Sequence, residues 1–327
     1  MAADGMLSFH ALAPAALGGL RPEGVRLGGQ DAPLLLLATE PADHQRRFWQ
    51  LRLRDITDAQ PPEPLLVHQL PANLPWDARV DATGWQLLTI RPGGALAPLM
   101  WLPAGARTPQ PVEPRGPRSL FGMPRFVAAP AAGDIVALNL ARDSAITLLR
   151  RHTPGAEPRR QELLPPRPGT LQQAQLLPWR DGHLLFVQTF VPNAGYRLEG
   201  SVTAREARYA GSVAVHALDA RGRRAGPAWA PLGEQPVFDF GIAVAGDQVG
   251  VLAVTAQGWL LAGGRPDLQG RGFGLLAQGA GAAALSSPCL QALPGRWRLA
   301  MIQDAGGTDP RVLLAEWPWQ GTGRQSF

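Results

Sequence analysis

The sequence predicts an all-β chain folded as a β-propeller, in its simplest form one of six blades. A polar or glycine turn followed by an apolar strand recurs six times, with copies starting at Asp31, Gly84, Asp134, Gly182, Asp247 and Gly295. The copies are 48 to 53 residues apart except for one interval of 65, and a period near 50 is typical of propeller blades. In addition, 33 prolines and 38 glycines interrupt most windows that could hold a helix.

Each unit has room for four strands. A shorter strand is expected before the recurring one, at residues 78–81, 125–128, 172–177, 237–244 and 288–293, and a third strand follows a second turn. A fourth apolar stretch beside Pro or Gly closes most units. In the second unit this fourth strand is hard to find, between residues 109 and 117.

The two ends of the chain complement each other. The sixth unit ends at Trp319 without a fourth strand, and the segment SFHALAPA from Ser8 can supply it. An N-terminal strand that completes the last blade closes the ring and removes an exposed sheet edge. This favours six blades in a single domain spanning residues 1–327, although a seventh blade in the interval between Gly182 and Asp247 is the alternative.

That long interval contains about fifteen residues more than the repeat requires. We place this insertion at residues 191–211 of the fourth repeat. It contains both tyrosines of the chain and several arginines, and we predict a partner-binding surface formed by Tyr196, Arg197, Arg205, Arg208 and Tyr209. Insertions on a rigid scaffold often carry binding residues, and Tyr and Arg often anchor interfaces. The alternative is an extended hairpin without a binding role.

Composition and charge favour a cytoplasmic protein without a membrane segment. The N-terminus lacks a basic region before its apolar residues, and no apolar run has the length of a membrane span. All 31 basic residues are Arg, the net charge is +5, and the arginine doublets are scattered. We interpret these arginines as solvated turns and strand edges, so nucleic-acid binding is an alternative rather than the main expectation.

The sequence shows no recognisable catalytic or metal-binding motif. Six histidines are scattered without metal-ligand spacing, and Cys289 on an apolar strand is expected to be a structural thiol. We expect His183 to begin the innermost strand of the fourth unit, where it would face the central channel. The glycine-rich segment around Gly270 lacks the Lys-Ser/Thr of a phosphate-binding loop. No catalytic residue, metal or cofactor is therefore predicted.

The stretch GSVAVHALDARGRRAGPAWAPLG at residues 211–233 is similar to the strand–Asp–Gly–strand pattern of many bacterial β-propellers. The resemblance is generic: the repeated Trp-Asp dipeptide and the Asp-box S-x-D-x-G-x-T-W are absent. By analogy with bacterial propellers that accompany an AAA-type ATPase, it implies a non-catalytic protein-interaction scaffold within a bacterial multi-protein system.

Two other functions stay open. One is a small-molecule hydrolase or lactonase that uses the central channel, which carboxylates converging at one channel mouth would support. The other is an arginine-mediated nucleic-acid binder, which predicts steep salt dependence of binding.

Overall fold

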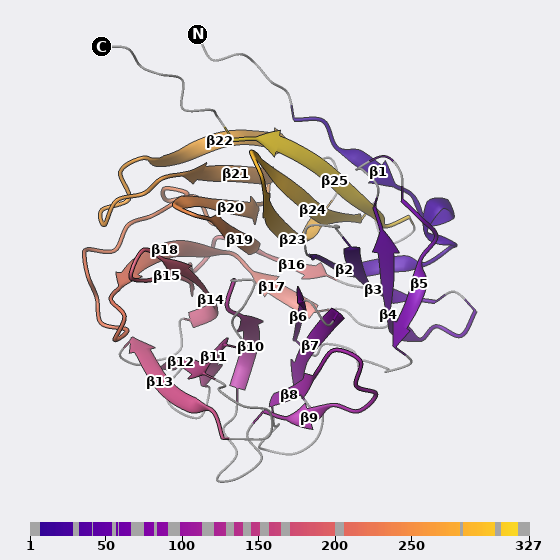
Figure 1. Cartoon of the computed structure of the whole chain (residues 1–327). Coiled ribbons are helices and arrows are strands. Elements are labelled where there is room, and N and C mark those ends of the chain that lie inside the picture. Colours follow the sequence, from indigo (N-terminus) through magenta and orange to yellow (C-terminus); the bar gives the residue numbers. More distant parts are fainter. Residues whose placement is uncertain are drawn as a thin grey trace.

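Six antiparallel β-sheets surround a common axis in this computed structural model, which confirms the six-bladed propeller (Figure 1). The first strands of neighbouring blades contact one another all the way around the axis, in the order β2, β6, β10, β14, β19 and β23. The structure describes residues 7–28, 33–40, 42–53, 57, 59–66, 75–81, 84–90, 99–112, 121–128, 134–139, 145–150, 157–164, 171–199, 206–281, 284–304 and 309–319.

The first three blades each contain four strands, numbered outward from the axis. Blade 1 consists of β2 (Arg21–Leu27), β3 (Pro33–Thr39), β4 (Arg46–Arg52) and β5 (Glu63–Leu66). Blade 2 consists of β6 (Trp76–Asp81), β7 (Gly84–Ile90), β8 (Leu99–Leu102) and β9 (Gln110–Pro111). Blade 3 consists of β10 (Phe121–Phe126), β11 (Ile135–Asn139), β12 (Ala145–Arg150) and β13 (Arg159–Leu164). The strand that was hard to find in the second unit, β9, is two residues long.

Of the other three blades, blade 5 repeats this pattern, whereas blades 4 and 6 differ in their outer strands. Blade 4 consists of β14 (Leu171–Trp179), β15 (Gly182–Phe190) and β18 (Gly211–Leu218). Blade 5 consists of β19 (Asp239–Ala245), β20 (Gln248–Val254), β21 (Gly258–Gly264) and β22 (Phe273–Ala280). Blade 6 consists of β23 (Ala284–Leu293), β24 (Arg296–Asp304), β25 (Arg311–Pro318) and β1 (His10–Leu12). On the outside of blade 4, three isolated bridges to Arg224, Trp229 and Val237 replace a regular fourth strand.

The ring is closed by its own N-terminus, as the sequence predicts. β1 pairs antiparallel with β25 and forms the outermost strand of blade 6. Leu12 enters a core cluster with Val312 and Leu314 of the C-terminal strand and with Leu17 and Leu20, which follow β1 in the chain. Both ends of the chain therefore contribute to one sheet, and closure depends on the apolar face of a three-residue strand.

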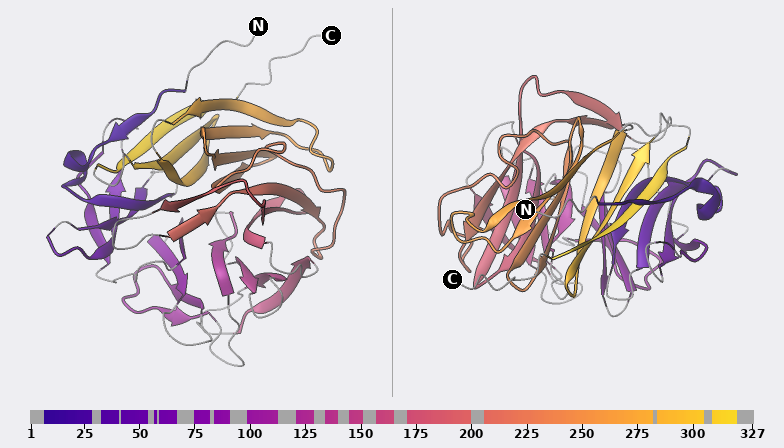
Figure 2. Two further views of the ribbon diagram at one scale, coloured as in Figure 1. Left: turned by 180° about the vertical axis from the view of Figure 1, so that it is seen from behind. Right: turned by 90° about the horizontal axis from the view of Figure 1, so that it is seen from above.

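A separate hairpin interrupts blade 4 between β15 and β18. Its strands are β16 (Tyr196–Glu199) and β17 (Glu206–Tyr209), and they pair with each other rather than with the blade. The hairpin stands on one face of the ring and extends over its centre in the pink-to-salmon part of the chain (Figures 1 and 2). Because β15 ends where the innermost strand β14 begins, this is the face at which the inner strands start.

Tryptophans and glycines pack the blades against each other. Trp297 on β24 is 1% exposed and lies against Gly250 of blade 5, where an added Cβ would approach the indole to 3.1 Å. Trp85 on β7 packs in the same way against Gly28 at the end of β2. These two tryptophans are each the second residue of the second strand of their blade, so a large aromatic at this place fills the space between neighbouring blades.

Helix is nearly absent from the described residues. The exception is η1 (Pro14–Leu17), a short 3-10 turn with Gly18 in the left-handed conformation at its end. In this part of the chain no helix has the length and apolar character needed to cross a bilayer. Residues 42–47 form a polar turn and the start of β4, and Leu51 and Leu53, which alternate with arginines in the following segment, are buried.

Candidate functional site at the propeller axis

Each inner strand carries a polar side chain that belongs to one group at the axis. Its members are Arg26 on β2, Asp77 on β6, Arg125 on β10, Gln173 on β14, Asp239 on β19 and Ser287 on β23. We call these residues, together with Gln188 on the adjacent strand β15, the axial network. It brings one polar residue from each blade to the axis of a protein whose blades are otherwise packed with apolar side chains.

Register shifts place several of these residues. Four of the six inner strands have a bulge near their start, between Pro22 and Gly24, Gly122 and Arg125, Leu171 and Gln173, and Ser286 and Cys289. Within two of these bulges, Met123 and Ser287 have φ angles of 46° and 51°, which non-glycine residues rarely adopt. Bulges of this kind re-aim side chains and cluster next to functional sites.

Arg26 and Asp77 join blades 1 and 2 through a nearly buried ion pair. Arg26 Nε donates to Asp77 Oδ1 at 2.6 Å, and the guanidinium lies 4.6 Å from the centre of the Trp76 ring. The other carboxylate oxygen of Asp77 accepts the backbone N–H of Phe126 at 2.7 Å. Burial by itself lowers the pKa of Arg26, but the Asp77 carboxylate, with smaller contributions from Cys289 and Asp239, raises it overall. Arg26 is therefore a permanent positive charge at the axis.

Arg125 and Gln173 continue the network through blades 3 and 4. Arg125 donates from Nη1 to the carbonyl oxygen of Trp76 at 3.0 Å and from Nη2 to Gln173 Oε1 at 3.4 Å. Gln173 is 1% exposed and donates from Nε2 to Gln188 Oε1 at 2.8 Å and to Asp239 Oδ1 at 3.0 Å. A buried amide with this many partners has a fixed orientation, so Gln173 positions Asp239.

Asp239 differs from Asp77 in how its oxygens are used. Its Oδ1 accepts both Gln173 Nε2 and the backbone N–H of Phe240, the latter at 2.8 Å. Within the described residues its Oδ2 has no hydrogen-bond partner, and this oxygen is not among the fully buried unpaired atoms. Asp239 thus presents one fixed and one free carboxylate oxygen, although the residue is only 6% exposed.

Blade 6 closes the network on the other side of Arg26. Ser287 Oγ accepts the backbone N–H of Val25 at 3.0 Å and a weaker contact from Arg26 Nη1 at 3.3 Å. Cys289 accepts the N–H of Leu27 through its sulfur at 3.2 Å. Burial raises the pKa of this thiol, although Arg26 opposes the shift. A neutral, hydrogen-bonded thiol agrees with the structural role expected for Cys289.

Four of the five residues predicted from the insertion lie on the separate hairpin and not in the axial network. Tyr196 and Tyr209 face each other across β16 and β17, and Arg197 pairs in register with Arg208. Tyr196 is 66% exposed and Tyr209 is 49% exposed. Arg205 lies outside the described residues. The partner-binding role assigned to these five residues stays a prediction.

His183 does not lie on an innermost strand, contrary to expectation. It lies on β15, the second strand of blade 4, because the strand before it, β14, occupies the axis. Burial lowers the pKa of His183, and Arg150 lowers it further while Asp134 acts in the opposite direction. In the part of the chain that the structure describes, no three His, Cys, Asp or Glu side chains are grouped so as to hold a metal ion.

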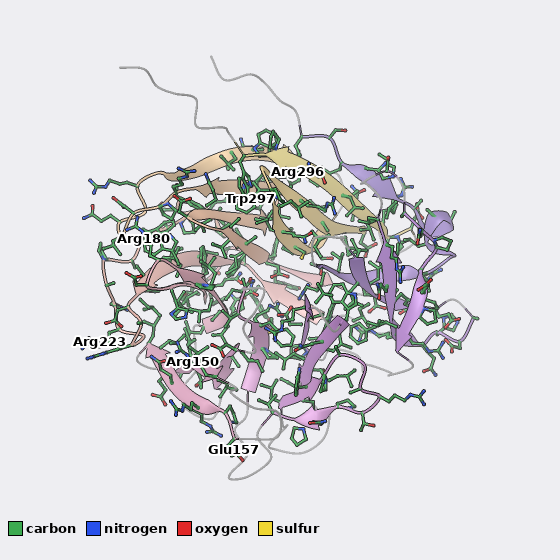
Figure 3. The ribbon with its side chains drawn as sticks, in the orientation of Figure 1. Arg150, Glu157, Arg180, Arg223, Arg296 and Trp297 are labelled. Carbon is green, nitrogen blue, oxygen red and sulfur yellow. The ribbon has the colours of Figure 1, made fainter. Side chains whose placement is uncertain are left out.

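Many arginines are paired locally with carboxylates. Arg46 pairs with Glu23 at 2.7 Å, Arg271 with Asp267 at 2.6 Å and Arg298 with Glu316 at 2.8 Å. Arg180 and Arg223 lie at the outer rim of the ring, far from the axis (Figure 3). Arg223, from one of the arginine doublets, therefore lies at the rim, whereas Arg26 and Arg125 lie in the axial network.

Sequence reasoning missed the axial network. Its residues come from all six repeats, and each lies in or before a largely apolar stretch. The available signal was that every inner strand carries such a residue, although at different positions: second in β6 but next to last in β2 and β10. The bulges obscured it, because they shift the two-residue alternation by which strand faces are assigned.

No protein-family model matches this chain, and no curated protein has a similar sequence. Solved structures are similar in fold. A Trypanosoma rangeli sialidase in complex with a difluoro-KDN ligand superimposes with a TM-score of 0.56 at 7% identity, covering 90% of this chain and 53% of the sialidase. The chain thus spans about half the length of that enzyme. An Aleuria aurantia lectin in complex with α-methyl-L-fucoside superimposes with a TM-score of 0.52 at 10% identity, covering 93% and 92%.

These comparisons correct the function expected from the sequence. The main expectation, a non-catalytic interaction scaffold within a multi-protein system, is wrong: the similar propellers with TM-scores above 0.5 are a sialidase and a lectin, both in complex with sugars or sugar analogues. At such low identity the likeness itself shows only the shared propeller fold. The chemistry has to be argued from the axial network.

Proposed function

We propose that this protein is a small-molecule hydrolase that cleaves glycosides at the mouth of its central channel, with Asp239 as the proton-transferring group. The observation that carries this proposal is the Oδ2 of Asp239, which has no hydrogen-bond partner among the described residues, beside an Oδ1 that is fixed by two hydrogen bonds. A general acid or base needs a carboxylate held in one orientation with an oxygen open toward the substrate.

The surrounding residues have distinct parts in this chemistry. In glycoside hydrolysis the bridging oxygen takes up a proton as its bond to the sugar carbon breaks, and water supplies a hydroxyl to that carbon and returns a proton. Asp239 would exchange the proton. Asp77 has both oxygens occupied, so it holds Arg26 in place. The charge of Arg26, within electrostatic range of both carboxylates, would stabilise negative charge developing on the leaving oxygen.

The glycoside class is supported by two independent considerations. Hydroxyl-rich ligands match a site built from amides, guanidinium groups and carboxylates, which together donate and accept hydrogen bonds. The similar propellers with TM-scores above 0.5 are named as a sialidase and a lectin, both in complex with sugars or sugar analogues. A lactone or ester substrate would use the same proton transfer and is distinguished by the assay.

A chromogenic substrate panel tests the proposal. The purified protein is incubated with 4-nitrophenyl glycosides, 4-nitrophenyl esters and lactones, and product release is measured. We expect cleavage of at least one glycoside, and a fall of about 10²- to 10⁴-fold in kcat for Asp239→Asn. Asp219→Asn is the matched control, because Asp219 also accepts backbone hydrogen bonds but lies in an exposed outer turn; it should retain the wild-type rate.

Two results would overturn the proposal. The first is no cleavage of any glycoside by a folded wild-type protein. The second is cleavage that Asp239→Asn leaves intact while circular dichroism shows an unchanged fold. Cleavage of esters or lactones alone would keep the hydrolase and reject the glycoside class.

A further inference from the structure

An exposed aromatic patch lies at the base of the hairpin on the proposed substrate face. Tyr209 contacts two other rings: Phe190 edge-on with centroids 5.8 Å apart, and Tyr196 at 6.0 Å. We call Phe190, Tyr196 and Tyr209 the aromatic platform. Among the described residues, five large hydrophobic side chains are exposed, and three of them form this platform. Exposed aromatics gathered in this way mark binding surfaces more often than isolated ones do.

The platform is continuous with the axial network through strand β15. Gln188, which accepts a hydrogen bond from Gln173, is separated from Phe190 by a single residue. At about 3.3 Å per residue, the two positions are roughly 7 Å apart along the strand. The hairpin that carries Tyr196 and Tyr209 then extends over the centre of the ring (Figures 1 and 2). A ligand seated at the channel mouth would reach this surface.

An unpaired side-chain amide lies close to Phe190 of the aromatic platform. Gln172 Nε2 is buried and has no hydrogen-bond partner among the described residues. It lies 2.9 Å from the position that a Cβ on Gly211 would occupy, and Gly211 is directly opposite Phe190 in the sheet. A buried donor without a partner is costly and rare, and it is accounted for when water or a ligand hydroxyl reaches it.

We propose that the aromatic platform is a saccharide-stacking subsite that holds a second sugar unit of an oligosaccharide substrate outside the channel mouth. The inference rests on the proposed function and adds its substrate class, glycosides of more than one sugar unit. A pyranose ring has a face of C–H groups that packs against an aromatic ring, and hydroxyls at its rim that bond to phenols and amides. Exposed tyrosines provide both kinds of contact.

The cross-strand pair of Tyr196 and Tyr209 also stabilises the hairpin, as aromatic pairs do. That contribution explains why the two rings touch each other. It does not explain why both stay largely exposed, or why Phe190 of the blade extends the platform. A structural role and a binding role therefore predict different outcomes for stability and for sugar binding.

The test measures binding to an array of immobilised mono-, di- and trisaccharides. We expect the wild-type protein and the cleavage-deficient Asp239→Asn variant to bind saccharides of two or more units. Tyr196→Ala and Tyr209→Ala should each weaken this binding about tenfold, and Tyr196→Phe should restore most of it. Leu275→Ala, which removes another exposed hydrophobic side chain on β22, is the matched control and should bind as wild type does.

The outcomes separate this inference from the proposed function. If glycosides are cleaved but the tyrosine variants bind the array as wild type does, or the wild type binds no saccharide, the stacking subsite is overturned and the hydrolase stands. If saccharide binding depends on the tyrosines but no glycoside is cleaved, the subsite stands and the hydrolase is overturned. If light scattering shows a dimer that Tyr196→Ala dissociates, and no saccharide binds, the platform is a protein interface and the inference is overturned.

Discussion

At the scale of single residues, Asp77 and Asp239 at the axis differ in which of their carboxylate oxygens accept hydrogen bonds. Asp77 directs one oxygen to Arg26 and the other to the backbone of Phe126, so nothing on this carboxylate is left for a substrate. Asp239 receives both of its hydrogen bonds on one oxygen. The difference arises from the neighbouring blade, which offers a guanidinium to Asp77 and an amide to Asp239. Identical side chains on equivalent strands are thereby differentiated by their partners.

His183 provides a test of the electrostatics at this scale. Burial and Arg150 lower its pKa below the ordinary value of 6.5, so the unfolded chain takes up a proton at a higher pH than the folded protein does. Stability should therefore be complete above about pH 6.5 and fall as the pH drops below it. His183→Gln should reduce this acid-side loss, measured as the difference in unfolding free energy between pH 7 and pH 5. If the variant shows the same pH dependence of stability as the wild type, the acid-side loss does not come from the lowered pKa of His183.

At the scale of elements, glycines and bulges allow the inner strands to approach one another. An added Cβ at Gly241 on β19 would lie 2.6 Å from the carbonyl oxygen of Pro288 on β23. At Gly24 the missing side chain makes room for the Trp76 ring, which in turn stacks on Arg26. The axial network thus depends on backbone positions where no side chain fits.

β1 provides the element-scale prediction, because its two faces differ. Leu12 is buried in the core shared by blades 1 and 6, whereas the preceding Ala11 is exposed. Leu12→Asp should lower the unfolding free energy by about 3 kcal/mol or more, since it places a charge in the core and releases the closing strand. Ala11→Asp is the control on the same strand and should cost less than about 0.5 kcal/mol. Equal effects in urea unfolding would show that β1 does not close the ring.

The sequence predicts the elements well where apolar strands recur. The six second strands, the inner strands of blades 2 to 6 and the closing strand were all identified from the pattern. The inner strand of blade 1, β2, was missed because Pro22 and Gly24 resemble a loop, and in the structure they form a bulge. Pro and Gly are tolerated there because the bulge interrupts the regular ladder.

At the scale of the whole molecule, closure of the ring brings together what the sequence separates. Arg26 and Ser287 are at opposite ends of the chain, yet they are hydrogen-bonded because blades 1 and 6 are neighbours. No local pattern predicts such a contact, so the site could not be recognised before the fold was known. The insertion, by contrast, was visible as an excess of residues over the repeat period, although its place over the centre of the ring was not.

The position of a bound sugar would show whether Asp239 and the axial network form the active site. Asp239→Asn should trap a disaccharide glycoside without cleaving it, and a crystal structure of that complex would locate the ligand. We predict the glycosidic oxygen within hydrogen-bond distance of residue 239, and the second sugar ring against Tyr209. A saccharide bound on the opposite face of the ring or on the outer side of a blade, with the axial network untouched, would contradict it.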